Sequence, residues 1–261
     1  MRGNHILRLF LPCLLLSTAM ACLVVRGTTA AVVSFSGTVT YSGSYAADTL
    51  FVAVMDTNTV SSEPTFLVMG AIPVGPPPFS QPFDVSFDNA LATGPLIVAA
   101  ALDVDGGGSQ TIGGGDIVGW YASTPDPALI SPATSLTGID FSLPLAEIHG
   151  TVTFGPDQTS ASVNAKSNGN CQSDSFQPML SLGSTGPYAM LGLYAGTYCI
   201  RGDGQSTSLG WISICYGDPL CASSTPVTLT TSQVVSGVDL DFSIIAPNEQ
   251  TTWGAVKSAY R

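Results

Sequence analysis

Apolar residues recur along this chain in short runs with a period of two, which is the pattern of β-strands rather than of helices. In residues 48–56 both alternating faces are apolar, which predicts a central strand covered from two sides. In residues 83–88 apolar and polar residues alternate, which predicts a half-exposed strand. Five prolines predict a loop at 73–82, because proline cannot donate to a β-ladder. Further strands are expected at 32–41, 96–102 and 139–143.

One strand phrase occurs twice and marks an internal repeat. It reads Ser-Gly-Thr-Val-Thr-Tyr at residues 36–41 and His-Gly-Thr-Val-Thr-Phe at residues 149–154. We therefore predict one module that was duplicated and then diverged, giving an all-β fold of two tandem antiparallel β-sandwich domains at 31–145 and 146–245. Further stretches match in the same order: 91–97 with 193–199, Gly119-Trp120 with Gly210-Trp211, and 138–143 with 237–244.

The repeated motifs resemble those of a known family. Gly-Thr-Val-Thr opens each unit, Leu-x-x-Gly-Thr-Tyr precedes a strand at 193–198, and Gly-x-Asp-Phe marks a closing strand at 138–141. This order is similar to the carboxypeptidase regulatory-like, or prealbumin-like (transthyretin-like), β-sandwich repeats of bacterial exported proteins, over most of residues 34–245. The resemblance implies an accessory module that positions, binds or stabilises and has no catalytic centre of its own.

The charge of the chain narrows the range of partners. Its 261 residues are 45% hydrophobic and only 10% charged, with a formal net charge of -11. The seven Lys and Arg residues are scattered, so a polyanion would be repelled over almost the whole surface. We therefore expect no nucleic-acid partner.

Residues 1–30 are expected to be a signal peptide and N-terminal leader. Two arginines flank a short apolar run at 6–16, and residues 19–21 have the small-x-small pattern of a cleavage site. The run is too short to span a membrane. Loss of residues 1–21 removes two arginines and no acidic residue, which changes the net charge from -11 to -13. We therefore expect an extracytoplasmic protein, either secreted or associated with the cell envelope.

Cys22 directly follows the cleavage pattern, as the acylated cysteine does in bacterial lipoproteins. The match is partial, because Ala19 stands where the lipoprotein motif usually carries Leu. Cleavage at residues 28–30 instead would remove Cys22 from the mature protein. Two hypotheses stay open: lipidation of Cys22, which is the only membrane association we expect, or a mature protein without an anchor.

Four cysteines fall in the part of the chain that is expected to fold. An even number in an exported chain indicates disulfides, and four cysteines allow three pairings. We favour Cys171 with Cys199 and Cys215 with Cys221, each of which would contribute about 3 kcal/mol. The sequence has no Cys-x-x-Cys spacing, so a zinc site or a redox role is the weaker interpretation.

The segment from Asp103 to Asp116 is the most specific candidate for a ligand site. Asp103 and Asp105 are spaced like the first ligands of calcium-binding loops, and glycines follow where a tight turn needs them. Gly107 and Gly114 stand where such loops usually carry further ligands, so Asp116 and backbone carbonyls would complete the shell. A flexible acidic turn without metal is the alternative. Calcium is the only cofactor that the sequence suggests.

The second unit is expected to carry Arg201-Gly202-Asp203-Gly204 in the place of this loop, without the paired acids. Arg-Gly-Asp is also the tripeptide that integrins bind. Three residues match often by chance, and a turn at the end of a strand explains them here.

A hydrolase would require a histidine, and the mature chain holds His149 alone. It lies inside the opening strand of the second unit, and the sequence has neither a Gly-x-Ser-x-Gly elbow nor a His-Glu-x-x-His motif. Asp239 and Asp241 are a carboxylate pair of the type that glycosidases use, but at this spacing they share the wet face of a strand. We therefore expect no enzymatic activity.

Aromatic residues suggest a glycan as a partner. Trp120 and Tyr121, with Trp211 and Tyr216 in the second unit, offer surfaces of the kind that stack on sugars. The alternative is that a Gly-Trp at one repeat position is a core anchor.

Residues 246–261 form a separate tail, in which Trp253, Val256 and Tyr260 would share one face of a short helix. The tail either docks on its own domain or acts as a C-terminal tag. The leading functional hypothesis is a non-catalytic, exported structural or binding module of the bacterial cell envelope or exterior, with an envelope or extracellular partner. A calcium-dependent or carbohydrate-binding module is the second hypothesis, and an envelope hydrolase is the third.

Overall fold

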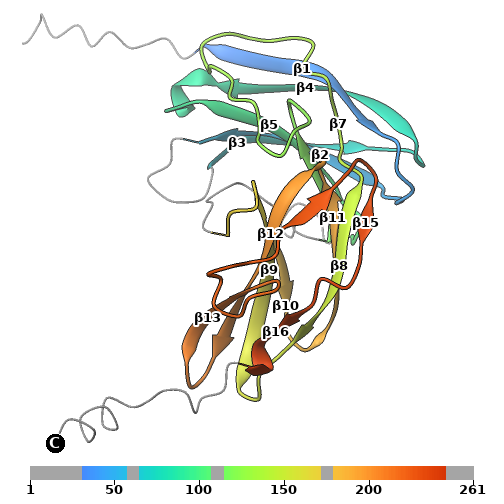
Figure 1. Ribbon diagram of the computed structural model, residues 1–261. Coiled ribbons are helices and arrows are strands. Elements are labelled where there is room, and N and C mark those ends of the chain that lie inside the picture. The colour runs from blue at the N-terminus through green and yellow to red at the C-terminus, as the bar shows by residue number, and fades with distance from the viewer. Residues whose placement is uncertain (1–30, 58–64, 107–114, 172–178, 245–261) are drawn as a thin grey trace, which may run out of the picture.

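The computed structural model describes residues 31–57, 65–106, 115–171 and 179–244, which form two β-sandwiches that follow one another in Figure 1. Over these residues the regular structure consists of strands and two single-turn 3-10 helices, η1 (Asn89–Leu91) and η2 (Phe242–Ile244). The prediction of an all-β fold is therefore confirmed. In the described part of the chain, no helix has the length and apolar character needed to cross a membrane.

The first sandwich buries one continuous apolar core between two sheets, and Phe35, Val52 and Val98 are fully buried there. Its strands are β1 (Val32–Tyr41), β2 (Thr49–Asp56), β3 (Thr65–Pro73), β4 (Phe79–Asp88), β5 (Leu96–Leu102), β6 (Ile117–Trp120) and β7 (Phe141–Ser142). One sheet has the order β4-β1-β7 and the other has the order β3-β2-β5-β6. β2 is an interior strand with both faces buried, as its sequence predicts.

The second sandwich repeats this arrangement around a core that includes Ile148, Val163 and Ile200. Its strands are β8 (Ala146–Thr153), β9 (Gln158–Ser167), β10 (Met179–Leu182), β11 (Gly186–Leu193), β12 (Gly196–Ser206), β13 (Gly210–Cys215), β14 (Val227–Leu229), β15 (Val234–Val235) and β16 (Leu240–Asp241). One sheet has the order β11-β8-β15, and β16 also pairs with β8. The other sheet has the order β10-β9-β12-β13, and β14 pairs with β12.

The two sandwiches share one topology, element by element. Strands β1 to β6 correspond to β8 to β13, and β7 corresponds to β16. Even a minor contact is repeated, because the isolated bridge between Phe35 and Leu136 has its counterpart in the pairing of Ile148 with Val235. The fold therefore supports the duplication that the repeated phrase indicates. The domain boundaries at 145 and 146 stay a prediction.

A backbone crossing explains the glycine of the repeated phrase. In the first sandwich the N–H of Ile139 donates to the carbonyl of Ser36 at 3.1 Å, and in the second the carbonyl of His149 accepts the equivalent bond at 3.2 Å. A Cβ on the next residue, Gly37 or Gly150, would overlap the carbonyl of the closing segment. Both positions therefore require glycine because the two backbones touch there.

Two features differ from the sequence-based expectations. The closing strands are parallel to the opening strands, β7 to β1 and both β15 and β16 to β8, because each closing segment arrives from the opposite sheet. The expected loop at 73–82 is too long, since β4 starts at Phe79 and contains Pro82. β4 is an edge strand, where proline costs no ladder hydrogen bond on the outer side.

The predicted match of the two Gly-Trp pairs is wrong. Trp120 lies opposite Ala99 in its sheet, and the equivalent place, opposite Arg201, is taken by Cys215. Trp120 is 1% exposed, whereas Trp211 is 75% exposed. The two tryptophans therefore have different roles, and only Trp120 is a core anchor.

The predicted place of Arg201-Gly202-Asp203 is also wrong. These residues lie inside β12 and not in a turn at its end. The register of the sheets makes Gln205 the counterpart of Asp103. The Arg201 guanidinium pairs with Asp203 at 2.8 Å on the sheet surface, so the tripeptide is part of a structural polar network.

Tyr194 joins the two sandwiches. It follows β11, and its ring packs against Trp120 of the first sandwich with ring centroids 5.4 Å apart. Its hydroxyl accepts the backbone N–H of Trp120 at 2.9 Å and lies 3.3 Å from the carbonyl of Ser142, to which it can donate. Burial raises the pKa of this phenol far above its ordinary value, so it stays protonated. A side chain of the second sandwich thus satisfies backbone groups of the first.

Replacement of Gly37 by alanine is expected to destabilise the protein by about 1–3 kcal/mol or more, because the new methyl group would push the closing segment away. Chemical denaturation followed by circular dichroism measures this change. Gly75→Ala is the matched control, since a Cβ there meets nothing within 4 Å. Equal stability of the two variants would contradict the crossing as the reason for glycine.

The Tyr194→Phe variant is expected to lose about 1–3 kcal/mol of unfolding free energy, because the buried N–H of Trp120 loses its acceptor. Urea unfolding measures the loss. Tyr121→Phe is the control, as no described group forms a hydrogen bond with that hydroxyl. A Tyr194→Phe variant as stable as this control would show that the ring alone holds the junction.

Candidate functional site

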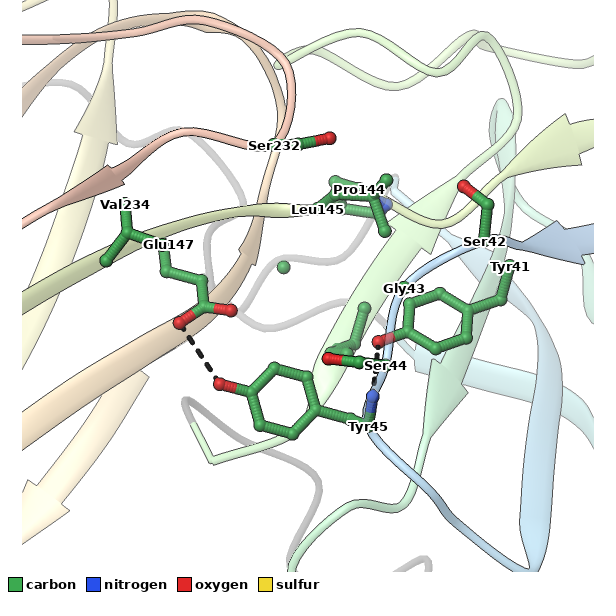
Figure 2. Close-up of a pocket in the computed structure, with 12 residues that line it drawn as sticks. Tyr41, Ser42, Gly43, Ser44, Tyr45, Pro144, Leu145, Glu147, Ser232 and Val234 are labelled. Carbon is green, nitrogen blue, oxygen red and sulfur yellow. Dashed lines mark hydrogen bonds between the residues drawn. The ribbon is translucent and has the colours of Figure 1, made fainter. Parts of the chain in front are cut away.

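A cavity of about 350 Å³ lies between the two sandwiches, and we call it the junction pocket. Figure 2 shows that residues 41–45, which begin at the last residue of β1, form one wall, while Glu147 of β8 lies on the other. Pro144 and Leu145 of the connection between the sandwiches lie along one side, and Ser232 and Val234 lie at the rim. The pocket therefore exists only where both sandwiches meet.

The wall at residues 41–45 is a turn held by its own first side chain. Strand β1 ends at Tyr41, whose hydroxyl folds back and accepts the N–H of Tyr45 at 3.2 Å (Figure 2). A Cβ on Gly43 would overlap the ring of Tyr41, so the absence of a side chain allows this contact. The turn therefore presents the two phenol rings to the pocket in a fixed arrangement.

A bulge in β11 contributes Gly192 to the lining of the pocket. The pairing of β11 with β8 shifts register between Met190 and Leu193, and Gly192 adopts a positive φ of 65° in the bulge. A Cβ at Gly192 would come within 2.7 Å of the Cγ2 atom of Ile117 in the first sandwich. The second sandwich can therefore approach the first this closely only through a glycine.

Glu147 is the acid of the pocket. The hydroxyl of Tyr45 donates to its Oε2 atom at 3.1 Å, and the Nε2 atom of His149 lies 2.7 Å from the same oxygen. The Glu147 side chain is 13% exposed and that of His149 is 38% exposed. Figure 2 shows the other carboxylate oxygen turned toward the cavity. The pocket thus offers one fixed negative charge with an oxygen available to a ligand.

Both phenols of the pocket stay neutral. Burial raises the pKa of Tyr41 above its ordinary value, and the charge of Glu147 adds to this effect. Burial also raises the pKa of Tyr45, and so do its hydrogen bond to Glu147 and the nearby negative charge. Each hydroxyl therefore keeps its proton, which Tyr45 donates to Glu147 and which Tyr41 can donate to another acceptor.

His149 is not arranged as a catalytic base for a nucleophile. Its ring nitrogen faces Glu147, and within the described ranges no hydroxyl or thiol forms a hydrogen bond with the ring. A nucleophile–base pair requires that contact. In this geometry His149 orients the carboxylate of Glu147.

The three predicted metal ligands lie together at the open end of β5 and β6. Asp103, Asp105 and Asp116 each offer a carboxylate oxygen, and these oxygens lie within 4.8 Å of one another. Asp116 is buried and accepts the N–H of Val104 at 3.0 Å, while Asp105 is exposed. Gly107 and Gly114 lie outside the described residues, as does Cys22.

The four cysteines form the two disulfides that the sequence favours. The Cα atoms of Cys171 and Cys199 are 5.2 Å apart, and those of Cys215 and Cys221 are 4.9 Å apart. Cys171, Cys199 and Cys215 have sulfurs close enough for a metal, but the disulfides account for this proximity.

The aromatic residues expected to stack on sugars do not form one site. Trp120 is buried and Trp211 is exposed on β13, while Tyr121 and Tyr216 pack against the two cores. The rings that do line a cavity are instead those of Tyr41 and Tyr45. Their role depends on contacts between the sandwiches, for which the sequence carries no local signal.

Comparisons with known proteins give a weak structural likeness. No protein-family model matches the chain, and no curated protein matches it. A C-terminally truncated form of the tip fimbrial protein Mfa3 from Porphyromonas gingivalis has a TM-score of 0.33 and 9% identity, over 79% of this chain and 94% of that one. A proposed cell adhesion protein from Parabacteroides distasonis has a TM-score of 0.31 and 10% identity, over 80% of this chain and 89% of that one. Likeness at this level assigns neither family nor function.

Proposed function

We propose that this protein is an exported, non-catalytic binding module that holds a glycan in the junction pocket. The observation that carries the proposal is the composition of the pocket: two neutral phenols, several hydroxyls and a single carboxylate, contributed by both sandwiches. Sugars combine apolar ring faces with hydroxyl groups that both donate and accept hydrogen bonds. A pocket with aromatic walls and a few convergent polar groups is complementary to such a ligand.

A binding role fits this pocket better than a hydrolytic one. Canonical glycosidases place two carboxylates on either side of the scissile bond. Among the described residues of the junction pocket, Glu147 is the one acid, and its Oε2 atom already accepts hydrogen bonds from Tyr45 and His149. The carboxylate is therefore suited to hold a ligand.

An extracytoplasmic location is part of the proposal. Disulfides persist in oxidising compartments, and the second sandwich carries two. The leader predicted at residues 1–30 would direct the chain to the same location, and lipidation of Cys22 would tether the module to the envelope. A prealbumin-like family relation is proposed on the sequence motifs alone.

The Tyr45→Ala variant is expected to bind monosaccharides about two- to tenfold more weakly than the wild type, since an aromatic contact contributes about 0.5–1.5 kcal/mol. Calorimetric titration with a panel of monosaccharides measures the affinities. Trp211→Ala is the matched control, because this exposed ring lies outside the pocket, and its affinity should equal that of the wild type. If no sugar binds, or if only the Trp211 variant is impaired, the junction pocket is not the glycan site.

Calcium binding at Asp103, Asp105 and Asp116 is the second candidate function. It is favoured by the proximity of the three carboxylates, which are the hard oxygen ligands that calcium prefers. This site lies in the first sandwich only, because Gln205 takes the place of Asp103 in the second. A metal there would stabilise the first sandwich next to the junction pocket, because Asp116 directly precedes Ile117, which lines that pocket.

Calcium at about 100 times its dissociation constant is expected to add about 2.7 kcal/mol to the unfolding free energy. Melting curves of the purified protein with calcium and with chelator, at equal ionic strength, measure the difference. The Asp103→Asn variant should lose the calcium effect, whereas Asp140→Asn, which removes an exposed acid elsewhere, should keep it. If the melting temperature of the wild type is the same with calcium and with chelator, these three residues form an acidic turn that does not bind calcium.

A further inference from the structure

Glu147 gives the junction pocket a property that a site for neutral sugars does not need. Its Oε2 atom is occupied by Tyr45 and His149, whereas no described residue donates a hydrogen bond to Oε1, which faces the cavity (Figure 2). The side chain is 13% exposed, so water screens its charge only in part. A ligand that enters the pocket therefore meets a strong acceptor in a fixed position.

No fixed positive charge offsets this carboxylate in the pocket. The described lining residues include neither Lys nor Arg. Lys166 and Arg201 are on the β10-β9-β12-β13 sheet, and the Arg201 guanidinium is already paired with Asp203. His149 touches Glu147, but a neutral imidazole can supply that hydrogen bond. The pocket also belongs to a chain with a net charge of -11, so the surrounding field favours a cation.

The two neighbouring tyrosines also feel the negative charge of Glu147, and their rings add to the attraction for a cation. The negative charge of Glu147 contributes to the raised pKa of both Tyr41 and Tyr45. Their aromatic faces carry partial negative charge, which also attracts a cation. The carboxylate and the aromatic rings therefore favour a ligand with a positive charge, and the hydroxyls of the pocket favour one that also carries hydrogen-bonding groups.

We propose that the junction pocket selects amino sugars with a free, protonated amine over neutral sugars. The ammonium group donates to Glu147 Oε1, while the sugar ring packs against the half-buried ring of Tyr45 and its hydroxyls reach Ser42, Ser44 and Ser232. This inference rests on the proposed glycan-binding function and names its ligand class. A bare metal ion fits less well, because calcium takes six to eight oxygen ligands and the pocket offers one carboxylate.

The proposal is tested by calorimetric titration of the full protein with glucosamine, N-acetylglucosamine and glucose at pH 7, which is below the ordinary pKa of an amine and above that of a free imidazole. Glucosamine is expected to bind about tenfold more tightly than the other two, because a charge-assisted hydrogen bond is about twice as strong as a neutral one. Added salt should weaken the binding of glucosamine more than that of glucose.

Variants then locate the preference. Glu147→Gln keeps the shape of the side chain and an acceptor for Tyr45, and it should make the affinities for glucosamine and glucose equal. Asp84→Asn removes a negative charge from an exposed position of β4 and should leave the preference intact. The ligand series on the wild type is decisive even if the Glu147 variant fails to fold.

The outcomes separate the two levels of the proposal. Equal binding of glucosamine and glucose by the wild type overturns amine selection and leaves the glycan site standing. Binding of none of the three sugars overturns both. If ethanolamine binds as tightly as glucosamine, the pocket recognises an amine rather than an amino sugar, and the proposal is overturned. The proposal is also overturned if Asp84→Asn loses the preference for glucosamine over glucose as completely as Glu147→Gln does.

Discussion

The hydroxyl of Tyr194 is the contact on which the arrangement of the two sandwiches depends. It inserts between β6 and β7 of the first sandwich and accepts the N–H of Trp120. A misplaced second sandwich would leave this buried donor unsatisfied, which costs more free energy than an apolar contact of similar size gains. The hydrogen bonds of Tyr194 therefore fix the relative position of the two sandwiches. Because the walls of the junction pocket come from both sandwiches, these bonds also fix the distance between the walls.

The two sandwiches agree on the inner faces of their sheets and differ on the outer faces. Ala99 and Ala101 of β5 lie in an apolar cluster with Trp120. Their counterparts in β12, Arg201 and Asp203, are linked by a hydrogen bond of 2.8 Å, and Asn164 also donates to Asp203. Two copies of one fold thus carry an apolar and a polar outer face, because only the inner face takes part in the common core.

The sequence predicts what depends on local pattern. The alternation in β2 and β4, the repeated phrase and the favoured disulfide pairing all have local signals, and the structure agrees with them. The match of Trp211 with Trp120 was wrong because it rested on a shared Gly-Trp dipeptide, whereas the register of the sheet, which the sequence does not show, makes Cys215 the counterpart of Trp120. The junction pocket was not predicted, since the contact of Tyr45 with Glu147 joins residues 102 positions apart and depends on how two domains meet.

The backbone crossings at Gly37 and Gly150 limit which substitutions the fold can tolerate. The outer faces of the two sandwiches can differ, as Ala99 and Arg201 illustrate, because such a difference leaves the backbone path unchanged. At the two crossings any mutation adds atoms where another peptide carbonyl already lies. The requirement to fold is therefore by itself a sufficient reason for glycine at both positions, whatever the two sandwiches bind.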